Sequence, residues 1–151
     1  MNYARLFYAA VAFTVISQAV HIAGAMADMG FYTDASNASL WSKLMMATPT
    51  SAPGTDFYVL SIFFSAITGL IFADAYSMTK HLFTTKKSFR SDKYWNIGLK
   101  FGMFLFMLTA LTGAMGMFLT FAVPFGLLVS WLAQSLVISL AAGVAFAKII
   151  G

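Results

Sequence analysis

The chain has 151 residues, of which 60% are hydrophobic and 9% are charged, and its formal net charge is +4. Soluble domains carry about 25% charged residues, so this composition predicts an integral membrane protein. The absence of cysteine excludes disulfides, thiolate metal sites and thiol catalysis. The gathering of basic residues in one short segment disfavours nucleic-acid binding.

The first predicted element is an apolar helix over 3–27. It is longer than the apolar core of a signal peptide, which has roughly 7 to 15 residues. It also contains the polar residues Ser17, Gln18 and His21. We therefore expect a retained membrane helix, while the small residues at 23–27 leave open the alternative of a cleaved leader.

A polar loop over 28–55 follows this helix. Four apolar residues recur within it at helical spacing: Leu40, Trp41, Leu44 and Met45. They follow Asp34 and Ser36, either of which is a suitable helix cap. The pattern predicts a short amphipathic helix that lies in the membrane interface.

Three further apolar spans complete the chain. The second span covers 56–79, with Asp56 as its N-cap, and the basic segment 80–93 follows it. The third covers 94–122 and the fourth 125–148. Each span reaches the roughly 20 residues needed to cross a bilayer. The sequence thus predicts a single all-α domain: an integral membrane four-helix bundle with a short interfacial helix in its first outer loop.

The placement of charge predicts the orientation of the bundle. One side of the membrane carries the basic residues of 80–93 with Arg5 and Lys148. The other side carries three acids and one base: Asp28, Asp34, Asp56 and Lys43. The positive-inside rule then places both termini in the cytoplasm and the loop 28–55 outside.

The stretch Gly98–Thr120 gathers its small and hydroxyl residues on one helix face. They recur at steps of three, four or seven: Gly98, Gly102, Thr109, Thr112, Gly113, Gly116 and Thr120. The fourth span has a four-residue repeat of small residues: Ser135, Ser139, Gly143 and Ala147. Such faces let helix backbones approach closely, and they favour association within the chain or between subunits.

Polar residues inside the spans are the candidate site. At ~1.5 Å per residue, four of them lie about nine residues from the outer ends of their helices: Gln18, Ser65, Thr112 and Gln134. They form either an interhelical hydrogen-bond clamp or a binding layer for a ligand or ion. His21 lies one turn further out. We expect it to be a hydrogen-bonded structural histidine, because the other histidine, His81, lies on the opposite side and a haem would need a second ligand at matching depth.

Asp74 is the one acid inside a span, and Lys100 lies at matching depth on the next helix. An unpaired charge at that depth is costly, so we predict a structural ion pair between them. The alternative is a carboxylate that couples to protons or cations.

The sequence contains no catalytic constellation, so we expect neither an enzyme nor a cofactor or metal. The leading hypothesis is a protein that acts through helix–helix association, as a homo-oligomer or as a subunit of a membrane complex. The alternative is a small transporter or channel protomer that uses the polar layer. A lipid- or quinone-binding protein is a third hypothesis. The expected partners are membrane lipids and other membrane protein subunits.

The four spans, the opening run 1–7, the long first outer loop and the run Gly98–Gly102 together resemble a group of small bacterial integral membrane proteins that contain a domain of unknown function. The resemblance implies a four-helix fold in the bacterial inner membrane and implies no activity. The small multidrug exporters are less similar, because they carry a glutamate in the first helix and this chain has no Glu. The trimeric glutathione- and eicosanoid-type membrane enzymes have a charged helix signature that is missing here.

Overall fold

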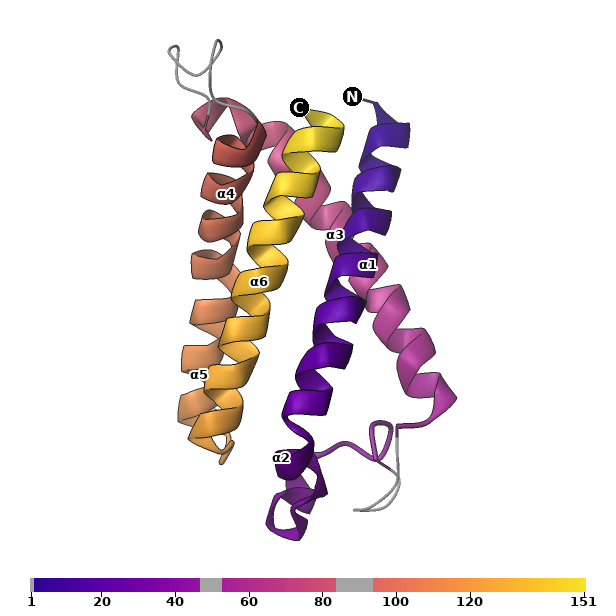
Figure 1. Cartoon of the computed structure of the whole chain (residues 1–151), viewed down its shortest axis with the longest axis vertical. Coiled ribbons are helices and arrows are strands. Elements are labelled where there is room, and N and C mark those ends of the chain that lie inside the picture. Colours follow the sequence, from indigo (N-terminus) through magenta and orange to yellow (C-terminus); the bar gives the residue numbers. More distant parts are fainter. Residues whose placement is uncertain (1, 47–52, 84–93) are drawn as a thin grey trace.

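The computed structural model of the chain describes residues 2–46, 53–83 and 94–151. Long helices run along the whole molecule, and both termini lie at the same end (Figure 1). The elements in chain order are α1 (Tyr3–Ala27), α2 (Met29–Thr33), the 3-10 helix η1 (Ala35–Leu40), α3 (Thr55–Phe83), α4 (Tyr94–Leu105), the π-helix η3 (Phe106–Leu111), α5 (Thr112–Thr120) and α6 (Phe125–Ile150).

Four helical stretches are long and apolar enough to cross a membrane: α1, α3, the continuous stretch Tyr94–Thr120 and α6. The predicted all-α four-helix bundle is thus confirmed, and its four spans are those of a multi-pass membrane protein. The first span has the predicted limits. The second begins at Thr55, which places Asp56 in the first turn of the helix rather than at its cap, and continues to Phe83.

The third span differs from a single regular α-helix. Its middle, η3, is a π-helix, in which the turn is wider than in an α-helix. The Thr109 hydroxyl donates to the carbonyl of Leu105 at 2.7 Å, and the Thr112 hydroxyl donates to the carbonyl of Met107 at 3.1 Å. Threonine hydroxyls that bond back to the preceding turn are associated with bent helices.

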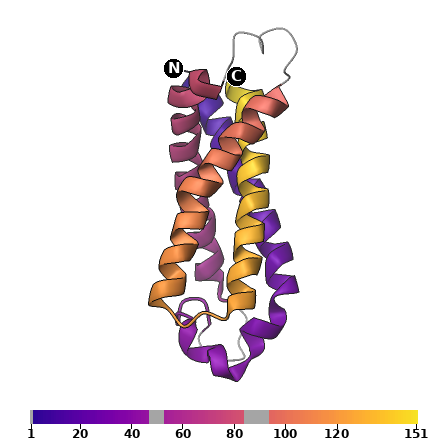
Figure 2. The ribbon, with the colours of Figure 1, turned by 90° about the vertical axis from the view of Figure 1, so that its left-hand side faces the viewer.

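Helix α6 is the centre of the bundle, because it packs against both α4 and α1, while α1 also packs against α3. We call the end that holds both termini the terminal end, and the end that holds α2 and η1 the loop end. Toward the loop end, α5 diverges from α6 (Figure 2), and α3 slants away from the other helices (Figure 1).

The helices are closely packed in the half of the bundle nearer the terminal end. Its core contains four buried aromatic side chains from all four spans: Phe13, Tyr76, Phe101 and Phe146. The rings of Tyr76 and Phe101 lie 5.0 Å apart, edge to face. Glycine contacts join α4 to α6, since a methyl group at Gly98 would lie 2.5 Å from the Cα atom of Val144 and 2.7 Å from the carbonyl oxygen of Gly143.

The loop end is covered by α2 and η1. The predicted Asp34 cap is present, because its carboxylate accepts hydrogen bonds from the Ser36 N–H at 2.8 Å and from the Ser36 hydroxyl at 2.7 Å. The helix that it begins is shorter than predicted and ends at Leu40, since the backbone at Trp41 is extended. The Trp41 ring instead packs against Tyr32, with ring centroids 4.9 Å apart. Tertiary contact therefore overrides the helical spacing of the sequence.

Most of the predicted basic segment 80–93 lies outside the described residues, as does part of the turn before α3. Lys80 is described, and its ammonium group donates to the carbonyl of Ile150 at 3.2 Å. This contact ties the end of α3 to the end of α6.

Candidate functional site

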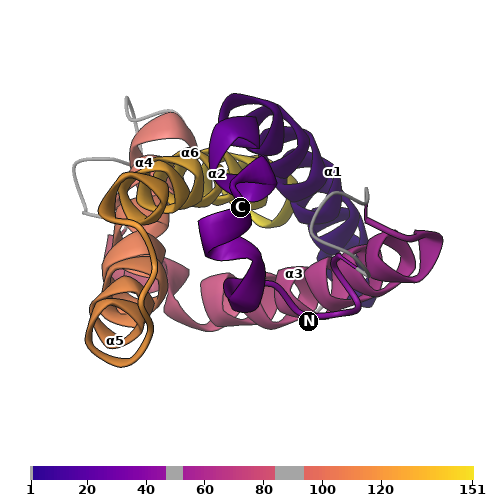
Figure 3. The same ribbon diagram turned by 90° about the horizontal axis from the view of Figure 1, so that it is seen from below.

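A cavity of about 880 Å³ occupies the half of the bundle nearer the loop end. Residues of α1, α3, α5 and α6 line it, together with residues of α2 and the segment after η1. Seen from the loop end, α2 and η1 lie across the end of the bundle, over the region between these helices (Figure 3). The cavity is of the size typical for small-molecule and cofactor sites.

The local sequence explains why the half of the bundle nearer the loop end contains a cavity. A methyl group at Gly113 or Gly116 would meet no described atom within 4 Å outside the nearby backbone of its own helix. The small face of α5 therefore has no helix packed against it, unlike the face at Gly98. Of these two glycines, Gly113 lines the cavity and Gly116 does not.

Most of the cavity lining is apolar. Methionines and aromatic rings come from several elements: Met26, Met29, Met45, Met46, Phe57, Tyr58 and Met117. Methionine side chains are flexible and adapt to irregular ligands. Among the described lining residues there is no Lys, Arg, Asp or Glu, so a charged ligand would find none of these side chains as an ion-pair partner in the cavity.

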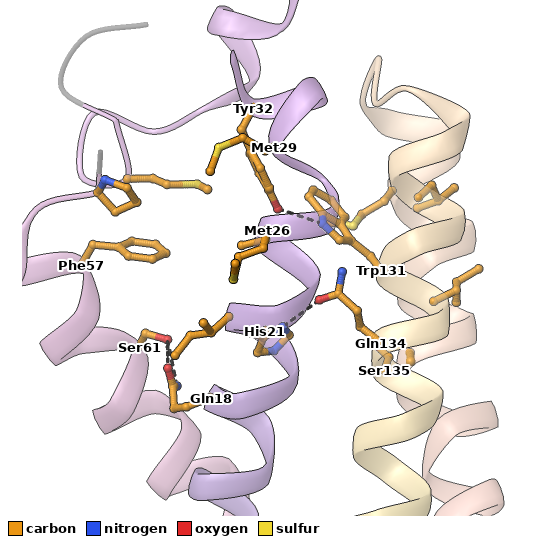
Figure 4. A pocket seen from close by; sticks show the side chains of 18 of the residues that line it. Gln18, His21, Met26, Met29, Tyr32, Phe57, Ser61, Trp131, Gln134 and Ser135 are labelled. Carbon is orange, nitrogen blue, oxygen red and sulfur yellow. Dashed lines mark hydrogen bonds between the residues drawn. The ribbon is translucent and has the colours of Figure 1, made fainter. Parts of the chain in front are cut away.

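The predicted polar layer forms in part. The Gln18 amide donates to the Ser61 hydroxyl at 3.1 Å and to the Ser65 hydroxyl at 3.0 Å. Gln18 thus joins α1 to α3 as a hydrogen-bond clamp. Gln18 and Ser61 also line the cavity (Figure 4).

Gln134 belongs to a different cluster, which is centred on Asp28. This carboxylate is 4% exposed and accepts hydrogen bonds from the Ser130 hydroxyl at 2.9 Å and from the Gln134 amide at 3.0 Å. The Gln134 carbonyl oxygen lies 3.4 Å from Nδ1 of His21. The cluster therefore links the loop end of α1 to α6, and His21 and Gln134 are its members that line the cavity (Figure 4).

Three aromatic side chains lie at the loop end of the cavity. The Trp131 indole N–H donates to the Tyr32 hydroxyl at 3.3 Å, and the ring centroid of Trp41 lies 4.9 Å from that of Tyr32 and 6.4 Å from that of Trp131. Burial raises the pKa of the Tyr32 phenol, the nearby Asp28 charge raises this pKa further, and the hydrogen bond from Trp131 opposes the shift. Tyr32 therefore stays neutral in the physiological range.

A second cavity of about 450 Å³ adjoins the first toward the middle of the bundle. The two share His21, Ser61, Thr109, Ala110 and Ser135. Hydroxyl groups from every span line the second cavity: Ser17, Ser61, Ser65, Thr68, Thr109, Ser135 and Ser139. Polar groups thus extend from the main cavity to the level at which the aromatic core begins.

Two predicted contacts are not present. Thr112 lies at the expected depth, but its side chain is exposed and bonds to its own helix, so it joins neither polar cluster. Asp74 and Lys100 form no ion pair. Oδ1 of Asp74 is buried with no hydrogen-bond partner in the described chain, and Lys100 is exposed because Gly98, Phe101 and Gly102 form the face of α4 that packs on α6.

Sequence reasoning did not assign Asp28, Ser130 or Tyr32 to the site. A usable signal was present for Asp28, because it continues the helical face of His21 and Gly24 beyond the end of the apolar run. Ser130 and Gln134, four residues apart on α6, form the matching pair. The sequence does place Asp28 on the polar face of the first helix, but the predicted site was limited to the mid-membrane layer and His21, and Asp28 lies beyond both.

Comparison with protein-family models, with characterised proteins and with solved structures finds no match for this chain. The resemblance to small bacterial membrane proteins accordingly stays a prediction. No group of three metal-binding side chains occurs in the part of the chain that the structure describes. The candidate site is thus defined by its cavity and its hydrogen-bonding groups alone.

Proposed function

We propose that this protein binds a neutral amphipathic lipid within the membrane. The observation that carries the proposal is the cavity of about 880 Å³, with an apolar lining and a few polar groups on one side. An apolar pocket with a small number of convergent polar groups is typical of a ligand site. A phosphate headgroup is disfavoured because no Lys or Arg is among the described lining residues.

This proposal ranks the lipid- or quinone-binding hypothesis above helix association. Of the small residues that suggested association, Gly98 and Gly143 contact each other within a single chain, and Gly113 lines the cavity. The transporter hypothesis draws support from the hydroxyl-lined second cavity, but the buried aromatic residues lie between that cavity and the terminal end.

The proposed orientation follows the charge distribution, with the termini in the cytoplasm of a bacterial cell and the cavity in the outer half of the inner membrane. Arg5, Lys80 and Lys148 belong to the terminal end, whereas the loop end has Asp28 and Asp34 against a single base, Lys43. Because the chain has no cysteine, a single Ser36→Cys variant tests this directly. An impermeant maleimide should label it in intact cells, and protection of this residue would contradict the orientation.

Lipid binding is tested by native mass spectrometry of the protein released from nanodiscs, with identification of the bound molecules. Gly113→Phe should fill the cavity and remove the bound neutral lipid. Gly116→Phe is the matched control, because it adds the same side chain to the same helix outside the cavity, and it should retain the lipid. Absence of lipid from the wild-type protein, or equal occupancy in both variants, would contradict the proposal.

A further inference from the structure

The hydrogen bonds around Asp28 fix the orientation of the Gln134 side chain. An ionised carboxylate can only accept hydrogen bonds, so the group of Gln134 that faces Oδ2 of Asp28 must be its NH₂. The same NH₂ lies 3.2 Å from the Ser130 hydroxyl oxygen, and that hydroxyl donates to Asp28. Both amide hydrogens of Gln134 are therefore engaged.

The position of Gln134 is also fixed by packing. Its amide lies over Gly24, where any Cβ atom would overlap it. The carbonyl oxygen is thereby directed at His21. Since a carbonyl oxygen accepts and never donates, the 3.4 Å contact is a hydrogen bond only in the tautomer whose Nδ1 carries the hydrogen.

This arrangement defines which groups His21 offers to the cavity. In a neutral imidazole only one nitrogen is protonated, so Nε2 is left with a free lone pair. The ring lines both cavities, and Nε2 is on the edge away from the nitrogen that faces Gln134. Each Gln18 amide hydrogen, by contrast, is already engaged by Ser61 or Ser65.

We propose that Nε2 of His21 accepts a hydrogen bond from the hydroxyl group of the bound lipid, so that the ligand is a neutral lipid alcohol. Asp28 and Gln134 act as positioning residues that hold His21 in the accepting tautomer, as outer partners do for other functional histidines. The inference rests on the proposed lipid-binding function and specifies its ligand class. The apolar lining then receives the hydrocarbon part of the molecule.

The test compares geranylgeraniol with its methyl ether, which has the same hydrocarbon chain but no hydroxyl donor. Binding to the protein in nanodiscs is measured for the wild type and for His21→Phe. The wild type should bind the alcohol about fivefold more tightly than the ether, since one hydrogen bond is worth about 1 kcal/mol. His21→Phe should remove this preference while the ether still binds.

A second measurement reads the tautomer without a substitution at His21. The chain has two histidines, so ¹⁵N-histidine labelling gives NMR signals from only two imidazole rings. The His21 signals should show a protonated Nδ1, and the Nε2 resonance should shift when the alcohol is added. Gln134→Leu should weaken this tautomer preference and the preference for the alcohol together. A protonated Nε2 in the wild type would overturn the inference.

The remaining outcomes separate the two proposals. Equal binding of alcohol and ether, abolished in both cases by Gly113→Phe, would overturn the role of His21 and leave lipid binding standing. A preference for the alcohol that persists in His21→Phe would likewise overturn the role of His21 and leave lipid binding standing. Failure of both probes to bind the wild-type protein would overturn both proposals.

Discussion

Gly98 and Gly113 lie on the same membrane-spanning stretch, yet their surroundings differ completely. A methyl group at Gly98 would press against the backbone of α6, and one at Gly113 would enter open space. Between the two glycines lies the π-helix η3, after which α5 diverges from α6 (Figure 2). The same small-residue pattern therefore gives a close helix contact in one half of the bundle and a cavity wall in the other.

The two halves are also stabilised by different interactions. In the half nearer the terminal end, glycine contacts and stacked aromatic rings bring the helices together. In the other half, hydrogen bonds at Gln18 and Asp28 connect neighbouring helices around the cavity. One half of the bundle is thus closely packed and the other contains the cavity, and substitutions in the two halves should differ in their effect on stability.

The largest effect is expected for Gly98→Ala. The added methyl group would meet backbone atoms of Val144 and Gly143, which cannot rotate away as a side chain can. Overpacking of this kind costs about 1–3 kcal/mol, and we expect the upper end of that range. The free energy of unfolding, measured by SDS titration in mixed micelles, checks this.

Gly116→Ala is the matched control for Gly98→Ala. It makes the same change on the same span, where the methyl group has space, and alanine favours the helix by about 1 kcal/mol over glycine. We expect unchanged or slightly increased stability. Equal destabilisation by the two substitutions would contradict the difference between the halves.

Asp28→Leu should have the next largest effect. The partly buried Ser130 hydroxyl and Gln134 amide would lose their shared acceptor, and since leaving fully buried donors unpaired costs about 1–3 kcal/mol, we expect the lower part of that range. The same SDS titration measures this loss. Asp34→Ala serves as the comparison because Asp34 is exposed, and loss of its cap should cost about 1 kcal/mol or less. A smaller loss for Asp28→Leu than for Asp34→Ala would show that the buried carboxylate does not stabilise the loop half.

The fold was predictable because hydropathy and length determine membrane spans almost independently of the other contacts. The first span has the predicted limits, and the Asp34 cap depends only on local hydrogen bonds. The π-helix was not predictable, because Phe106–Leu111 contains no Pro or Gly and is as apolar as its surroundings. Its position depends on how α4 packs on α6, which sequence periodicity does not encode.

The candidate site was predictable by depth but not by direction. Gln18 and Ser65 were expected at one level, and they do meet. Thr112 lies at the same level but faces away, since a helix with a π turn changes the direction of every later side chain. Depth along a helix follows from residue number, whereas rotation about its axis depends on tertiary packing.

A moderate effect is expected for Gln18→Leu. Hydrogen bonds between membrane helices are worth about 0.6 kcal/mol on average, so loss of the bonds to Ser61 and Ser65 should cost less than about 2 kcal/mol. A double-mutant cycle with Ser65→Ala, measured by SDS titration, isolates the contact between α1 and α3. A coupling energy of zero would show that the clamp does not hold the cavity wall in place.

The smallest expected effect on the free energy of unfolding comes from Tyr32 at the loop end, and it appears only at alkaline pH. Burial and the Asp28 charge raise the pKa of the phenol in the folded protein, while in the unfolded chain it ionises near pH 10, at about its ordinary value. Above that pH the unfolded state releases a proton that the folded state retains, so the free energy of unfolding should fall as pH rises from about 10 toward the folded pKa. Below pH 10 the two states bind the same proton, and this contribution vanishes.

Tyr32→Phe should reduce the loss of stability between pH 9 and pH 11, measured by SDS titration at each pH, because the variant has no phenol to ionise. The range brackets the ordinary pKa of tyrosine at about pH 10. If the Tyr32→Phe profile instead matches the wild type, water reaches the phenol freely, and the aromatic cover of Tyr32, Trp41 and Trp131 does not close the cavity at the loop end.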